Sequence, residues 1–120
     1  AYARLARKVV LYHGQVHRAL SLTPADVVGL LEALGLFKQP EGLSGVILAC
    51  MADARGRPGF ESMAYPQGKR LARALDVARG VSPASLLSQG LSGAALGGAL
   101  KALRIEAVSA SITAGNEPSG

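Results

Sequence analysis

The stretch of sequence that decides the fold is Ala52-Asp53-Ala54-Arg55-Gly56-Arg57-Pro58-Gly59-Phe60-Glu61-Ser62. Charged residues, glycine and proline here interrupt a chain whose other long segments carry a helical pattern. Glycine and proline are the strongest interrupters of regular structure, so Gly56, Pro58 and Gly59 should end the helix that enters the stretch. We therefore expect helices on both sides of a charged connection.

Three helices are predicted upstream of this connection. Residues 2–18 and 43–54 each repeat apolar side chains at spacings of three and four, which is typical of a helix with one buried face. Between them, Thr23 can cap a helix over residues 24–34. Cys50 falls on the apolar face of the third helix, so we interpret it as a buried small hydrophobe rather than a nucleophile.

Downstream, the pattern predicts a helix over residues 66–79, a short one over 82–87 and a last one over 92–107. No segment shows the sustained alternation that is typical of a strand. Residues 111–120 have little apolar pattern, and we expect a disordered tail there. The predicted fold is all-α: a single compact domain of five to seven short helices over residues 1–110.

The composition limits the class of protein. The chain has 120 residues and a net charge of +5, so we expect one domain, and nucleic acid is the commonest partner for such a charge. The alternative is that the charge only keeps a small protein in solution. The single cysteine permits no disulfide within the chain, which fits a reducing compartment, and we expect a cytoplasmic protein. No run approaches the ~18 apolar residues of a membrane span.

Basic residues gather around the charged connection and on the helix that follows it. Between residues 55 and 79 the chain carries Arg55, Arg57, Lys69, Arg70, Arg73 and Arg79. Glu61 and Asp76 are the only acids in that interval. This surface can contact phosphates or simply face water, and the pattern leaves both open. Asp53 either orients an arginine toward a phosphate or forms a local ion pair that holds the connection.

His13 and His17 are four residues apart in the first predicted helix. If the helix continues through Gly14, both rings lie on one face and could bind a metal together. A zinc or iron site needs at least three ligands, however, and nothing nearby in the sequence supplies the others. A histidine pair at a helix end or in the core is the alternative.

The quoted stretch, followed by Tyr65-Pro66-Gln67-Gly68, resembles the C-terminal part of bacterial CCA-adding enzymes. The similarity is closest to the multifunctional type, in which a tRNA nucleotidyltransferase is fused to an HD domain. Further similar segments occur in the same order at residues 12–20, 22–24, 90–97 and 103–108, so the match covers residues 1 to about 110. The Asp-Ala-Arg-Gly-Arg and Tyr-Pro-Gln-Gly segments are its most specific parts.

The resemblance implies that this chain is the C-terminal part of an HD-type helical domain that binds or positions tRNA. In the family, a nucleotidyltransferase head adds C, C and A to the tRNA 3′ end with CTP, ATP and magnesium. Its signature, a glycine-rich segment followed by paired acidic ligands, is not found in these 120 residues, so we expect them to be catalytically inactive alone. They begin within a helical pattern, and we expect an upstream nucleotidyltransferase domain as a partner in the same parent chain.

Two further functions stay open. The resemblance implies that an HD-type metal-dependent phosphohydrolase acting on 2′,3′-cyclic phosphates or phosphate monoesters is one, with His13 as a ligand of a transition metal. Some members carry His-Asp where this chain has His13-Gly14, which argues against that activity. The other is self-association, possible as a homodimer, since Gly93, Gly97 and Gly98 form a small-residue surface that permits close approach of another backbone. For tRNA contact, the expected residues are Arg55, Arg57, Lys69, Arg70 and Arg73.

Overall fold

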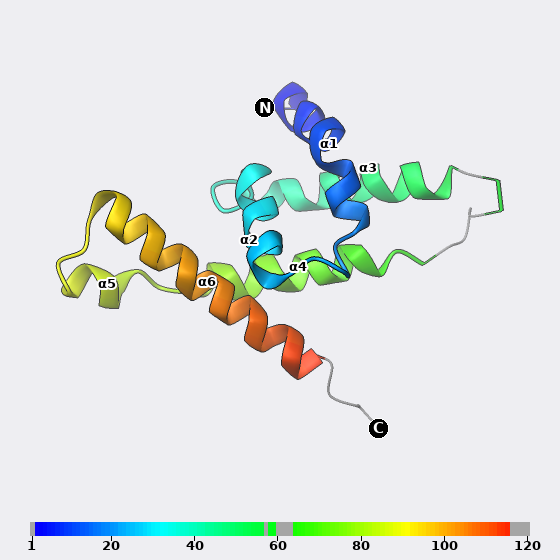
Figure 1. The fold of residues 1–120 in the computed structure, drawn as a ribbon. Helices are drawn as coiled ribbons and strands as arrows, with labels where there is room; N and C mark the ends of the chain where they lie inside the picture. Colours follow the sequence, from blue (N-terminus) through cyan, green and yellow to red (C-terminus); the bar gives the residue numbers. More distant parts are fainter. Residues whose placement is uncertain (1, 57, 60–63, 116–120) are drawn as a thin grey trace.

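The computed structural model describes residues 2–56, 58–59 and 64–115. Over these residues the chain consists of α-helices, a single 3₁₀ helix and connecting turns, and contains no strand (Figure 1). The elements are α1 Tyr2–His17, α2 Pro24–Ala33, η1 Pro40–Gly42, α3 Leu43–Arg55, α4 Pro66–Arg79, α5 Ala84–Ser88 and α6 Gly93–Gly115. The predicted all-α class is confirmed.

Local sequence signals explain most helix ends. Thr23 caps α2, because its Oγ1 accepts a hydrogen bond from the Asp26 backbone N–H at 3.1 Å. Pro24 occupies the first helical position, where a missing N–H has no cost. Beyond the end of α2, Gly35 has φ 73°, a conformation that glycine adopts without strain. These ends fall within a residue or two of the predicted ones.

The last helix is longer than the sequence predicted. Helix α6 continues to Gly115, so residues 111–115, which we had placed in a disordered tail, are helical. Its continuation past residue 107 is explained by Val108, which is fully buried, and by Ile112, which packs against the core. The remaining tail residues, 116–120, lie outside the described part of the chain.

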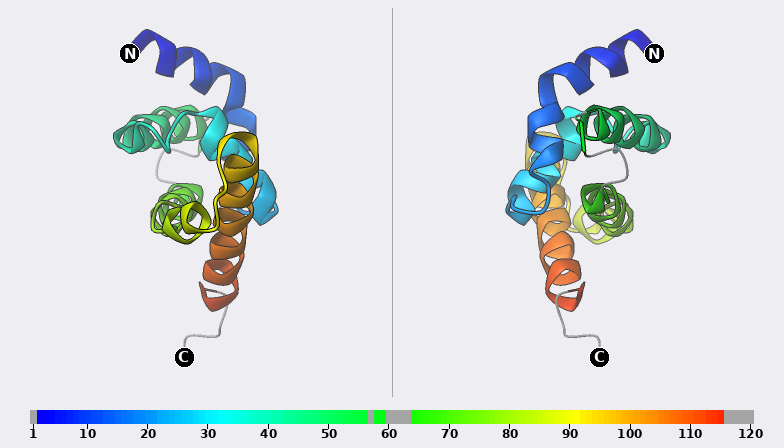
Figure 2. Two further views of the ribbon diagram at one scale, coloured as in Figure 1. Left: turned by 90° about the vertical axis from the view of Figure 1, so that its left-hand side faces the viewer. Right: turned by 90° about the vertical axis from the view of Figure 1, so that its right-hand side faces the viewer.

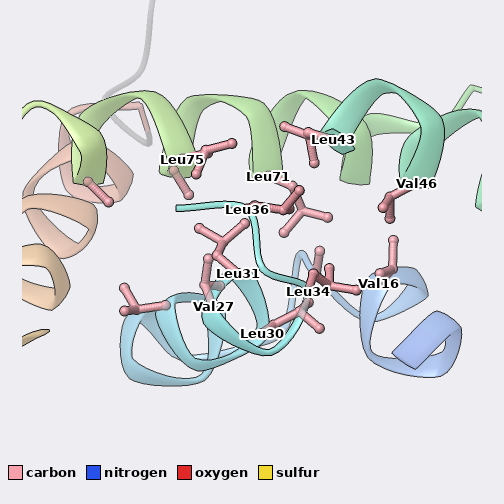
Figure 3. Packing of buried hydrophobic residues seen from close by; sticks show 14 of the residues in the cluster. Val16, Val27, Leu30, Leu31, Leu34, Leu36, Leu43, Val46, Leu71 and Leu75 are labelled. Atoms are coloured by element: carbon pink, nitrogen blue, oxygen red, sulfur yellow. The ribbon is translucent and has the colours of Figure 1, made fainter. Parts of the chain in front are cut away.

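The core lies between α2 and α4 and is closed at its sides by α1, α3 and α6. Leu71 and Leu75 of α4 point toward Leu31 of α2 and toward Leu36, which follows α2 (Figure 3). Helix α2 buries apolar residues at four of its ten positions, and all are at most 2% exposed. Among the described residues, the buried set holds hydrophobic side chains and no polar or charged ones. Burial of this apolar surface is the main force that stabilises the arrangement.

The molecule is flat, with principal extents of 55 × 43 × 19 Å. Helices α3 and α4 form one layer, and α6 runs alongside it (Figure 2). The N-terminal half of α1 extends away from the body (Figure 1). In the middle of the helix, Val10 and Leu11 are 71% and 74% exposed, while the neighbouring Val9 packs against the core. No helix in the described part of the chain combines the length and the apolar character that crossing a bilayer requires.

Candidate nucleic-acid interface

The ends of α1, α3 and α4 meet at His17, and we call this the His17 corner, made of His17, Asp53, Tyr65 and Gln67. The His17 Nε2 lies 3.0 Å from Asp53 Oδ2 in the last turns of α3. Its Nδ1 lies 2.9 Å from the hydroxyl of Tyr65, the residue just before α4. The side-chain amide of Gln67 donates to the His17 backbone carbonyl at 3.0 Å. One residue of α1 is therefore bonded to both ends of the segment that joins α3 to α4.

The hydrogen-bond partners fix the tautomer of a neutral His17. An ionised Asp53 carboxylate only accepts, so Nε2 carries the proton and donates to it. The Nδ1 lone pair then accepts from the Tyr65 O–H. Burial, and to a smaller extent the nearby Cys50 and Asp53, raise the pKa of Tyr65 to about 12. Tyr65 thus keeps its proton near neutral pH and serves as a hydrogen-bond donor.

The corner gives a structural reason for each residue of Tyr65-Pro66-Gln67-Gly68. The tyrosine and the glutamine bond to His17, and the proline begins α4. A Cβ placed on Gly68 would lie 2.9 Å from Ile47 Cγ2, so only glycine allows α4 to pack this closely on α3. The segment therefore docks the start of α4 against α1 and α3.

Four of the five residues predicted to contact tRNA are described, and they lie in the two helices that this corner joins. Arg55 is in the last turn of α3, and Lys69, Arg70 and Arg73 are in the first half of α4. Lys69 and Arg73 are exposed on the side of α4 opposite its buried residues. Arg70 is half-buried, and its Nε is buried without a hydrogen-bond partner. Arg57, the fifth predicted residue, lies outside the described residues.

The structure gives Asp53 a partner that the sequence did not indicate. We had expected it to orient an arginine or to pair with one locally. Its carboxylate binds His17, 36 residues earlier, and Arg57, one of the arginines concerned, lies outside the described residues. Asp53 is mostly exposed, with 62% of its side chain accessible, whereas His17 is 27% exposed. The bond thus lies at the edge of the core, where solvent screens the charge only in part.

His13 and His17 do lie on one face of α1, because the helix continues through Gly14 to His17. Their ring centroids are 6.0 Å apart in an edge-to-face arrangement. Both ring nitrogens of His17 already have partners, and His13 Nδ1 lies 2.8 Å from the Val10 carbonyl. Within the described residues, no group of three or more His, Cys, Asp and Glu could hold a metal ion. The pair therefore does not fit a metal without ligands from elsewhere.

The chain is similar to proteins described as "Multifunctional CCA protein". It is 48% identical to the one from Methylococcus capsulatus, 44% to that from Thioalkalivibrio sulfidiphilus and 45% to that from Pseudomonas syringae, in each case over at least 87% of this chain. This chain is related to the C-terminal region of the multifunctional CCA proteins. It spans about a quarter of the length of these relatives, 26% for each of the three. No protein-family model matches the chain, and no solved structure does.

In this relative of the multifunctional CCA proteins, the two most specific segments of the resemblance meet in space. Asp53 of the Asp-Ala-Arg-Gly-Arg segment and Tyr65 of the Tyr-Pro-Gln-Gly segment bind the same imidazole. Sequence reasoning found both segments and noted His17 only as half of a histidine pair. It missed the bonds of His17 to Asp53 and Tyr65, because these partners lie 36 and 48 residues away. A helical periodicity reports neighbours three or four residues apart, and it contains no signal for such long-range bonds.

Proposed function

We propose that this chain is the C-terminal helical part of a CCA-adding tRNA nucleotidyltransferase and that it binds and positions tRNA in the cytoplasm. The names of the relatives support the tRNA role. In the whole parent, a separate nucleotidyltransferase domain would add CCA with CTP, ATP and magnesium. The present residues would hold the tRNA body while that domain works on the 3′ end.

The observation that carries the proposal is the exposed basic face of α4 beside the end of α3. Lys69 and Arg73 are both exposed and lie one turn apart on α4. Arg55 is in the last turn of α3, on the other side of the connection between the two helices. Asp76, also exposed and less than one turn after Arg73, reduces the net positive charge at the far end of that face. A surface of this kind attracts phosphates of a folded RNA through charge.

The scarcity of aromatic residues favours contact with the RNA backbone over contact with bases. The chain has three tyrosines, two phenylalanines and no tryptophan. Tyr65 is 9% exposed and hydrogen-bonded to His17, and Phe37 packs against the core with Arg104 over its ring. Neither ring is available as a platform for a stacked base. Recognition through the shape and phosphates of a duplex fits these residues better.

The test is binding of the chain to tRNA over a series of salt concentrations. Lys69→Gln/Arg73→Gln removes two exposed charges without touching the core, and Arg55→Ala/Arg57→Ala removes the pair around the connection. Each phosphate contact contributes about 0.9 to the slope of log affinity against log salt, so each double variant should flatten it by about two. As a control of equal charge, Arg7→Gln/Lys38→Gln changes exposed residues elsewhere and should leave the slope nearly unchanged. Absence of binding, or equal slopes for all variants, would overturn the proposal.

A phosphohydrolase that uses a transition metal is the second candidate, favoured by the adjacent rings of His13 and His17. Because these residues do not complete a site, the missing ligands would have to come from the rest of the parent. This alternative predicts stoichiometric metal in the full-length parent and its loss in His13→Ala. Metal-free parent protein after purification without chelators would exclude it.

Self-association as a homodimer is a third candidate. A Cβ at Gly93, Gly97 or Gly98 would meet no atom within 4 Å, so the described part of the chain leaves this small-residue surface of α6 open. The close approach that we expected for these glycines is therefore not made within the described residues. A monomeric mass in solution at high protein concentration would exclude this candidate.

A further inference from the structure

We propose that His17 is a positioning residue for the RNA-binding surface: it holds the last turn of α3, with Arg55, in a fixed relation to the first turns of α4, with Lys69. The inference rests on the proposed tRNA-binding function, because it concerns how that surface is assembled. It adds a role for α1, which supplies none of the expected phosphate contacts.

The first support is that one imidazole bonds to both sides of a long connection. Asp53 lies three residues before the connection begins, and Tyr65 is its last residue before α4. Their bonds to His17 are 3.0 and 2.9 Å long. Closing a segment of this length has an entropic cost, which the two bonds and the Gln67 contact help to offset.

The second support is that the apolar core ends before the residues that need to be positioned. Cys50 is the last fully buried residue of α3, at 1% exposure, and Met51 and Ala54 are only partly buried. Helix α4, in contrast, has buried residues along its length from Gly68 to Ala78. The end of α3 therefore depends on the His17–Asp53 bond more than α4 depends on any single polar contact.

The third support is that His17 is itself held in place by its surroundings. Val16 and Ala19, on either side of His17, are both fully buried. The Gln67 side chain binds the backbone carbonyl of His17, so α4 is joined to the main chain of α1 as well as to the ring. Movement of the imidazole relative to α4 is thereby restricted, and Asp53 is held to a fixed point.

The direction in which Asp53→Ala changes the affinity for tRNA distinguishes a positioning role of Asp53 from a purely electrostatic one. Loss of a negative charge beside a basic surface should strengthen binding of an anionic RNA if only the charge counts. If His17 positions Arg55 through Asp53, the same change should weaken tRNA binding, by about fivefold at moderate salt. Asp53 is mostly exposed, so the variant is expected to fold. Glu106→Ala, which removes an exposed acid of α6, is the matched control and should bind tRNA as well as the unsubstituted chain does, or slightly better.

A double-mutant cycle then locates the effect. After His17→Ala or Asp53→Ala, the further change Arg55→Ala should have little additional effect on tRNA affinity, because Arg55 is no longer held in place. Arg73→Ala should remain additive, since α4 keeps its own buried face. Tighter binding by Asp53→Ala, or effects of Asp53 and Arg55 that simply multiply, would overturn the inference.

Trypsin cleavage after Arg55 supplies a readout that needs no RNA. In His17→Ala and Asp53→Ala this cleavage should accelerate about tenfold relative to cleavage after Arg79, because the end of α3 opens locally more often. If the unsubstituted 120-residue chain fails to bind tRNA, the proposed function fails. Accelerated cleavage in the variants would still support the role of His17 in fixing α3 to α4. Unchanged cleavage in Asp53→Ala would overturn that role whatever the RNA result.

Discussion

The His17 corner and helix α6 keep their helices in place by different means. At the corner, directional hydrogen bonds from His17 join three helix ends, and Gly68 permits a contact that a larger residue would obstruct. Helix α6 lies on α2 and α4 mainly through apolar packing, supported by a Lys101–Glu32 ion pair of 3.6 Å. The comparison teaches that residue identity is restricted at the corner, whereas α6 should tolerate change outside its buried residue Val108.

Truncation of Leu71 should produce the largest loss of stability. This side chain of α4 is 0% exposed, and Leu71→Ala should lower the free energy of unfolding by about 3 kcal/mol through lost burial and a cavity. Leu96→Ala in α6, only partly buried, should have a loss of about 1 kcal/mol. Denaturant unfolding measures both, with Leu87→Ala, 54% exposed, as a control near zero. Equal losses for Leu71 and Leu96 would show that the partly buried side of α6 contributes as much to stability as the buried face of α4.

Tyr65 should make the stability of the corner depend on alkaline pH. Its folded pKa of about 12 lies above the ordinary value of 10.0, so the folded state keeps the proton longer than the unfolded state. The resulting stability is complete below pH 10 and is lost as the pH rises toward 12, by about 2 kcal/mol. The free energy of unfolding, measured from pH 9 to 12, should fall more steeply for the unsubstituted chain than for Tyr65→Phe. Tyr2 and Tyr12 are common to both proteins and cancel in the difference.

Alanine at two helical glycines should change stability in opposite directions. In Gly68→Ala the new methyl group meets Ile47 Cγ2 at 2.9 Å, and α4 has to shift, so we expect a loss of about 1 kcal/mol. In Gly98→Ala the methyl group meets nothing within 4 Å, and better helix propensity should stabilise the chain by roughly 0.5–1 kcal/mol. Thermal unfolding of the two variants tests this. A destabilising Gly98→Ala would show that α6 is restricted as well.

The ion pair on α6 should have the smallest effect. Lys101 and Glu32 are both more than a third exposed, and exposed pairs contribute less than about 1 kcal/mol. Lys101→Ala should therefore change the free energy of unfolding by a few tenths of a kcal/mol, and added salt should reduce the difference further. A loss above 1 kcal/mol, measured by denaturant unfolding, would mean that α6 depends on this polar contact as the corner depends on His17.

Much of the fold could be predicted because its signals are local. The Thr23 cap, Pro24 and the apolar stripes of α2 and α4 define helix starts and buried faces within a few residues. The basic side of α4 was also readable, since Lys69 and Arg73 are one turn apart. Tertiary packing of Val108 and Ile112 decided the end of α6, and no local signal shows that packing.

The corner itself could not be predicted, for a physical reason. Asp53 stands beside Arg55 and Arg57, so sequence reasoning assigned it the nearest opposite charge. Its observed partner reaches it only because α1 passes across α3, an arrangement set by the whole core. The role of Arg55, Arg57, Lys69, Arg70 and Arg73 in tRNA contact, and of His13 in metal binding, stays a prediction.

The buried thiol of Cys50 gives this molecule its own reporter. It lies in α3 just before Asp53, is 1% exposed, and has a pKa that burial, and then the Asp53 carboxylate, raise above the ordinary value. A thiol in that state reacts with a labelling reagent only when the surrounding helices separate. Because the chain has a single cysteine, the labelling rate of Cys50 measures the frequency of those separations without any engineered dye or tag. The rate of Cys50 labelling, followed by mass spectrometry with and without RNA, therefore reports how often α3 opens.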